Sequence, residues 1–138
     1  MKANRITLIT LGVADMARAR AYYEALGWVP ESAEGAVAFY DLGGQKLGLY
    51  DRAKLAEDLG RAPEELGTGA MTLAQNFATE RQVDAAYEAA LAAGATPCKR
   101  PEKVFWGGYS GTLADPDGHV WEYAMNPFWP LDEEGRLE

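Results

Sequence analysis

Few side chains in this sequence have the types and surroundings that catalysis requires. The chain contains one histidine, His119, and one cysteine, Cys98. A Ser-His-Asp triad needs a histidine beside its nucleophile, but His119 follows an Asp-Pro-Asp-Gly turn, where we expect an exposed residue. A cysteine nucleophile needs a nearby base, so we interpret Cys98 as a small structural residue. The pairs Gly43-Gly44 and Gly107-Gly108 lack the spacing of nucleotide-binding loops.

Glu122 is the best single candidate for chemistry. It stands between Trp121 and Tyr123 in a predicted strand, so alternation would turn both rings to one face and the carboxylate to the other. A carboxylate in an apolar cleft can act as a general acid or base. It could also anchor a buried hydrogen bond, and the sequence leaves both interpretations open.

Trp106 and Tyr109 are candidates for ligand contact. They flank Gly107 and Gly108, and glycines allow a ligand to approach the backbone closely. Aromatic rings add flat contact area with a polar tip. Packing in the core or at an interface is the alternative interpretation for both rings.

The elements that must position these residues follow a pattern that occurs twice. In the first half, a strand at residues 6–13 precedes a helix that Asp15 caps and Gly27 ends. Short strands are predicted next, at residues 36–41 and 46–50.

The second half repeats this order. A strand at residues 71–77 precedes a helix with a capping box, Thr79 with Gln82. Strands are predicted at residues 109–114 and 119–124, and in each half the strand directly after the helix is the weakest prediction.

An internal repeat supports this reading. The segment DLGGQKLGLY aligns with DPDGHVWEYA, which places Gly48 on Glu122. Each half then reads β-α-β-β-β, so we predict an α+β fold. The expected parts of a single domain, residues 1–138, are module one at 5–52, a linker with a short helix at 53–68, module two at 69–126 and a C-terminal tail at 127–138.

The repeat also assigns strand faces in module one. Lys46 and Tyr50 share a face with Gly48, and Thr10 shares a face with Leu8, because side chains alternate along a strand. If these faces turn inward, as Glu122 is predicted to do, Thr10, Lys46 and Tyr50 become candidates for ligand contact.

Composition bounds the class of protein. The formal net charge of −8 repels phosphate backbones, so nucleic acid is not an expected partner, and it weakly favours a cationic ligand. No apolar run approaches the ~20 residues of a membrane helix, and the N-terminal residues lack the apolar stretch of a signal peptide. One cysteine permits no internal disulfide, which fits a cytoplasmic protein.

The tail is unusually apolar. It contains two prolines together with Phe128, Trp129 and Leu131. Prolines exclude a helix interior or a central strand, and the apolar side chains should avoid water. We expect the tail to fold back onto its own domain or onto a partner chain.

Several motifs together resemble those of one superfamily. A strand followed by Val-Ala-Asp and by a helix ending in YYEALGW, and the closing segment ADPDGHVWEYA, resemble vicinal oxygen chelate proteins, the glyoxalase/bleomycin-resistance protein/dioxygenase superfamily. The segments FWGGYSG and NPFWPL resemble one bacterial branch of it. The resemblance implies two βαβββ modules in a pseudo-twofold arrangement, a mixed sheet curled around a shared cleft, and a homodimer.

The resemblance also locates the metal-ligand positions of the superfamily's enzymes. In this sequence they fall on Leu8, on Gly48, on Thr72 or Gln75, and on Glu122. Leucine and glycine side chains carry no donor atoms, whereas Zn and similar ions take three or more His or carboxylate ligands. We therefore expect no metal and no other cofactor.

Three functions remain open. The first is a metal-free protein that binds a small organic molecule, as bleomycin-resistance proteins do. The second is a lyase or isomerase that uses Glu122, with or without a weakly held divalent metal. The third is a structural or accessory dimer without a small ligand.

Overall fold

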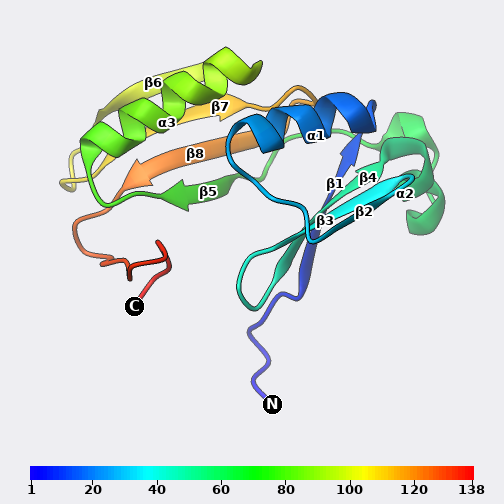
Figure 1. Cartoon of the computed structure of the whole chain (residues 1–138), viewed down its shortest axis with the longest axis horizontal. Coiled ribbons are helices and arrows are strands. Elements are labelled where there is room, and N and C mark those ends of the chain that lie inside the picture. The colour runs from blue at the N-terminus through cyan, green and yellow to red at the C-terminus, as the bar shows by residue number, and fades with distance from the viewer. The chain divides into compact units, whose positions relative to one another are not determined.

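The structure, a computed structural model, describes residues 1–138 and contains two βαβββ modules, as the repeat predicted (Figure 1). The first module consists of β1 (Leu8–Val13), α1 (Met16–Ala25), β2 (Ser32–Glu34), β3 (Val37–Asp41) and β4 (Lys46–Asp51). The second consists of β5 (Leu73–Asn76), α3 (Glu80–Ala93), β6 (Thr96–Lys103), β7 (Tyr109–Ala114) and β8 (Val120–Met125). The α+β prediction is confirmed.

Module one is a four-stranded mixed sheet in the order β1-β4-β3-β2. β1 runs parallel to β4, and the other neighbours are antiparallel. Helix α1 covers one face, and the rings of Tyr23, Trp28 and Tyr40 pack against one another between α1 and β3. The strand residues buried with them are Leu11, Val13, Leu47 and Leu49.

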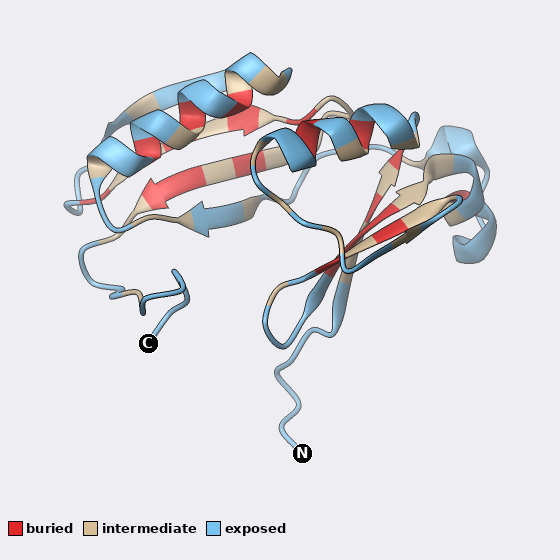
Figure 2. Cartoon of the chain, in the orientation of Figure 1, coloured by how far each residue is buried: buried red, intermediate tan, exposed pale blue.

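Module two repeats this topology in the order β5-β8-β7-β6, with β5 parallel to β8. Helix α3 covers one face, and its buried stripe of Val83, Tyr87 and Ala90 turns toward the sheet (Figure 2). The Tyr87 hydroxyl donates to the carbonyl of Thr112 at 2.9 Å. The buried strand residues are Leu113, Trp121, Tyr123 and Ala124.

The predicted helix caps explain where both helices begin. Asp15 accepts a hydrogen bond from the backbone N–H of Arg18 at 3.1 Å. Thr79 and Gln82 form both bonds of the capping box, so the first turn of α3 leaves fewer unpaired N–H groups. Gly94 ends α3 in the left-handed conformation that glycine adopts without strain.

The strand after α3 is longer and less regular than a sequence pattern could indicate. The register of β6 against β7 shifts twice, between Pro97 and Lys99 and between Lys99 and Glu102. Gly111 of β7 lies at this irregularity: a Cβ atom there would be 2.7 Å from the Pro101 nitrogen. The irregular strand therefore requires glycine at position 111.

Gly111→Ala is expected to lower the free energy of unfolding by about 1–3 kcal/mol, because the new methyl group meets backbone atoms that cannot move aside cheaply. Urea denaturation measures the change. Gly67→Ala is the matched control, since nothing lies within 4 Å of its Cβ position. Equal stability of both variants and the wild type would show that β6 adjusts freely.

The segment between the modules contains more structure than a linker. Helix α2 (Arg52–Leu59) confirms the predicted short helix, and a 3-10 turn follows at Pro63–Glu65. The Leu55 side chain lies 3.0 Å from the Cβ position of Gly12, so α2 packs on the end of β1. The Arg52 guanidinium donates to the carbonyls of Pro63 and Leu66.

The tail packs little against module two, so it does not fold back onto its own domain, which was one of the two expected arrangements. Phe128 and Trp129 remain 71% and 56% exposed. The tail instead bends onto itself through a bridge between Leu131 and Leu137. None of the helices has the length and apolar character needed to cross a membrane.

Candidate functional site

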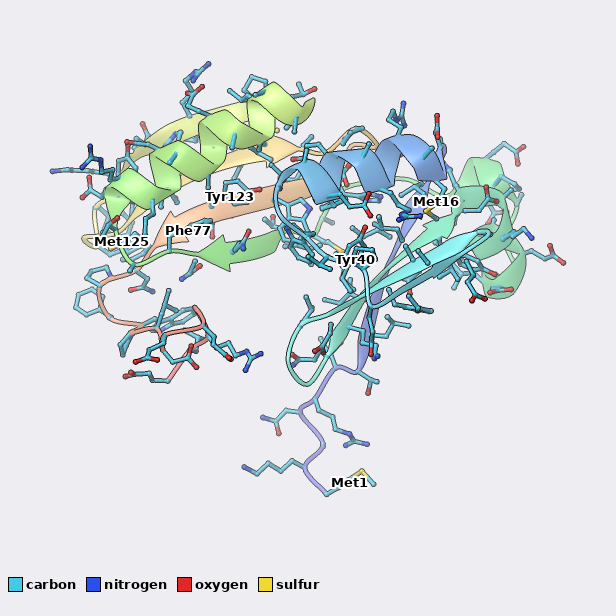
Figure 3. The ribbon with its side chains drawn as sticks, viewed as in Figure 1. Met1, Met16, Tyr40, Phe77, Tyr123 and Met125 are labelled. Atoms are coloured by element: carbon cyan, nitrogen blue, oxygen red, sulfur yellow. The ribbon has the colours of Figure 1, made fainter.

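Glu122 lies on the face of the module-two sheet that α3 leaves uncovered. Its neighbours Trp121 and Tyr123 are 6% and 4% exposed and turn toward the helix. The Tyr123 ring meets Phe77 edge to face, with centroids 5.6 Å apart (Figure 3). The predicted alternation along this strand is therefore present, and the Glu122 side chain points away from the helix-covered core.

Small side chains surround Glu122 on this face. Thr112 of β7 and Ala74 of β5 are its direct cross-strand neighbours. Further neighbours on the same face are Ser110, Ala114, Val120, Asn76 and Ala124. None of these carries a positive charge, and Glu122 forms no hydrogen bond or ion pair within module two. A half-buried carboxylate without a protein partner is thus open to a ligand.

Tyr109, a candidate for ligand contact, lies on the face opposite Glu122. Its hydroxyl donates to the Asp84 carboxylate of α3 at 2.7 Å. Thr112 pairs with Glu122, and Tyr109 is three residues away, which turns it to the other side of the sheet. The sequence could have predicted this face, because Tyr109 and the apolar Leu113 are four residues apart in one strand and therefore lie on the same side.

The Asp84 contact predicts how stability depends on alkaline pH. The hydrogen bond to Asp84, together with partial burial, raises the pKa of Tyr109 to about 12. The contribution to stability is present below the unfolded-state pKa near 10 and is lost as pH rises through about 12. Tyr109→Phe should cost about 1 kcal/mol or less at pH 7, since the pair is solvent-screened.

Urea denaturation of wild type and Tyr109→Phe at pH 7 and pH 11 measures this contribution. The stability difference between the two proteins should shrink at the higher pH. Asp84→Asn serves as a second variant, because it keeps an acceptor and removes the charge. A difference that is independent of pH would contradict the assignment.

Trp106 lies in the turn between β6 and β7. The backbone N–H of Val104 donates to the carbonyl of Gly108, and the backbone N–H of Gly107 donates to the carbonyl of Val104, both at 3.0 Å. The indole covers Gly108 so closely that a Cβ atom there would be 2.1 Å from the ring. Gly108 and Thr112 are separated by about 14 Å along an extended strand, so Trp106 does not adjoin Glu122.

Module one presents a comparable open face. Thr10 pairs with Gly48, and Leu8 pairs with Lys46, so these side chains lie on the face opposite α1. The Lys46 ammonium forms an ion pair with Glu31, which directly precedes β2. Thr10 is the candidate whose polar group has the simplest access to a ligand.

Tyr50 lies at the end of this face that α2 covers. Burial and a hydrogen bond toward Asp58 of α2 raise its pKa. The carboxylate therefore favours the protonated hydroxyl, and Tyr50 is associated with α2 as much as with the open face. The sequence placed Tyr50 on the correct strand face but gave no sign of this helix contact.

The metal-ligand positions that the resemblance implies can be compared with the geometry in each module. A Cβ atom on Gly48 would lie 3.3 Å from the Phe39 ring and 3.5 Å from Leu8, so this position is surrounded by apolar atoms. Because Thr10 pairs with Gly48 and Ala74 with Glu122, the residue that corresponds to Leu8 in module two is Thr72.

Gln75 is excluded from that position, because it pairs with Tyr123 and so turns to the helix side. Neither module contains three or more His, Cys, Asp or Glu side chains that could hold a metal ion. His119 is half-buried, and its backbone N–H donates to Asp115. One carboxylate and one hydroxyl do not fit the ligand requirements of a catalytic metal.

Comparisons of this chain with known protein families and structures agree with the fold and the motifs. The profile of the Glyoxalase/Bleomycin resistance protein/Dioxygenase superfamily matches residues 5–123. The chain therefore belongs to this superfamily, and the resemblance inferred from its motifs is confirmed. No curated protein matches the sequence.

The solved structures that are similar to this chain include a glyoxalase-related enzyme from Fulvimarina pelagi. It is 34% identical, with a TM-score of 0.90 over 98% of this chain and 97% of that chain. A family enzyme from Burkholderia phytofirmans is 22% identical, with a TM-score of 0.77 over 86% and 96% of the two chains. A lactoylglutathione lyase from Agrobacterium tumefaciens is 22% identical, with a TM-score of 0.69 over 95% and 100%. The last two show similarity of fold alone.

Proposed function

We propose that this protein binds a small, cationic organic molecule without a metal ion, through the open sheet face that carries Glu122. The observation that carries the proposal is the half-buried Glu122 carboxylate, which has no partner within module two and only small uncharged neighbours. A carboxylate that has lost part of its hydration gains from a cation close to it.

The absence of a fitting metal site supports the binding function over metal-dependent chemistry. Leu8, Gly48 and Thr72 leave Glu122 as the one ionisable group among the family's ligand positions. The net charge of −8 adds a general attraction for cations.

A second candidate is an enzyme, a lyase or isomerase in which Glu122 acts as general base. The observation that favours it is the 34% identity to a glyoxalase-related enzyme. A base needs its carboxylate accessible to the substrate, which the small neighbours of Glu122 allow. We further propose a cytoplasmic location, from the single cysteine, and a homodimeric state.

A thermal-shift screen tests the proposal. Aromatic molecules of matched size, either cationic amines, neutral molecules or anionic acids, are added to purified protein. In a second measurement, the metal content of the protein is determined by elemental analysis after dialysis without added metal. A ligand that binds only the native state raises stability by RT ln(1 + [L]/Kd). Stabilisation by cations alone, with no stoichiometric metal, is expected. Near one metal per chain, or a preference for anions, would overturn the proposal.

A further inference from the structure

Four exposed aromatic side chains gather at one end of module two. β7 and β8 are antiparallel, with Tyr109 opposite Met125, so the turn before β7 and the tail after β8 leave the sheet at the same end (Figures 1 and 2). Pro127 of the tail lies 3.9 Å from the Cβ position of Gly107. The aromatic patch consists of Phe105, Trp106, Phe128 and Trp129, which are 101%, 40%, 71% and 56% exposed.

The tail that carries half of this patch is ordered by its own hydrogen bonds. The Asn126 side chain accepts from the backbone N–H of Phe128 at 2.9 Å. The Asp132 carboxylate accepts from the backbone N–H groups of Glu134 and Arg136, both at 2.9 Å. Residues 127–138 therefore form a small hairpin that holds its rings outward although little of it packs on the module.

The shape and charge of the patch indicate a protein partner. Phe105 protrudes fully into solvent, whereas small molecules bind in concave sites. Large exposed apolar patches mark interaction surfaces, and aromatic residues are enriched at protein interfaces. The four carboxylates of the tail, against one arginine, disfavour anionic membranes and nucleic acid.

The complement of the tail lies on the same module. β6 is an edge strand with one side unpaired, and it leads directly into the turn that carries Phe105. Of its cations, Lys99 pairs with Glu102 and Arg100 pairs with Glu88 of α3. Lys103 is left as the cation of β6 without an ion pair, and its charge is opposite to that of the tail carboxylates. A surface that contains its own complement suits a twofold interface, in which each contact occurs twice.

We propose that the tail hairpin of one copy, residues 127–138, docks on the β6 edge and the aromatic turn of a second copy of this chain. The four rings of each copy are then buried between the protomers, and the acidic tail lies along the basic edge strand. This interface does not involve Glu122, so its existence is independent of the proposed ligand binding.

Sedimentation velocity across a concentration series tests the aromatic part of the interface. The variant Phe128→Ser/Trp129→Ser should raise the dimer Kd by about tenfold or more. Leu59→Ser is the matched control, because it also replaces an exposed apolar side chain, 55% exposed on α2, which is not part of the proposed interface. A wild-type protein that stays monomeric at about 100 µM, or an unchanged Kd in the double variant, would overturn the proposal.

Charge reversal tests the partner's identity even if the aromatic variant folds poorly. Lys103→Glu should weaken the dimer, and adding Glu133→Lys to the same chain should restore at least part of the affinity, because the two charges meet between copies. Loss without any recovery would contradict docking of the tail on β6. Glu122→Gln should leave the dimer Kd unchanged, which separates this test from that of ligand binding.

Discussion

Glu122→Gln should weaken binding of a cationic ligand by about tenfold to a hundredfold, which corresponds to about 1.5–3 kcal/mol for a hydrogen bond to a charged group. Glutamine keeps the shape of the side chain and removes its charge. Thr112 and Ala74, the direct neighbours, are uncharged. Another carboxylate on this face, Glu102 opposite Ser110, is already paired with Lys99, so it does not replace the lost attraction.

Isothermal titration of wild type and Glu122→Gln with the best cation from the screen measures the effect. Glu34→Gln is the matched control, since it removes the same charge from an exposed position on β2. The control should bind as the wild type does, apart from a small salt-dependent change. If Glu122→Gln binds the cation equally well, the carboxylate has no part in recognition.

Asp115→Ala should lower the free energy of unfolding by about 2–4 kcal/mol, because two backbone N–H groups lose their acceptor. Asp115 is 3% exposed, and its carboxylate accepts from the N–H groups of Asp117 and His119, both at 2.9 Å. These bonds shape the hairpin loop between β7 and β8, which sets the register that places Glu122 beside Thr112.

The variant Asp115→Asn shows whether the hydrogen-bond acceptor or the negative charge of Asp115 is responsible for the stability. The amide oxygen of asparagine can accept the same two bonds, so the loss should be well below that of alanine. Urea denaturation measures both variants. Ligand binding of Asp115→Ala should also weaken, because β8 loses the turn that positions it. Equal stability of the alanine and asparagine variants would show that the hairpin does not depend on these bonds.

Local patterns in the sequence were sufficient for the module architecture. Caps at Asp15 and Thr79, glycine at Gly94 and the alternation around Glu122 act over a few residues, so their effects can be read without knowing the partners. The internal repeat then gave the order of elements twice. These local signals agree with one another, which is typical of sequences that specify one fold.

Features that depend on contacts between distant residues could not be obtained in this way. The irregularity of β6 follows from its register against β7, and the close approach of Pro101 to Gly111 appears only once the strands are paired. The indole over Gly108 depends on the conformation of a turn. The hydrogen bond of Tyr109 to Asp84 could not be predicted either, because Asp84 lies on another element.

The sequence by itself determined the α+β modules, the family and the direction in which Glu122 points, because each depends on periodicity or on motifs that lie together in the chain. Only the tertiary structure decided that Glu122 has small uncharged neighbours, that Phe39 and Leu8 surround Gly48, and that the tail leaves its rings exposed. Strand pairing and side-chain packing bring together residues far apart in sequence, and no local pattern records which of them will meet.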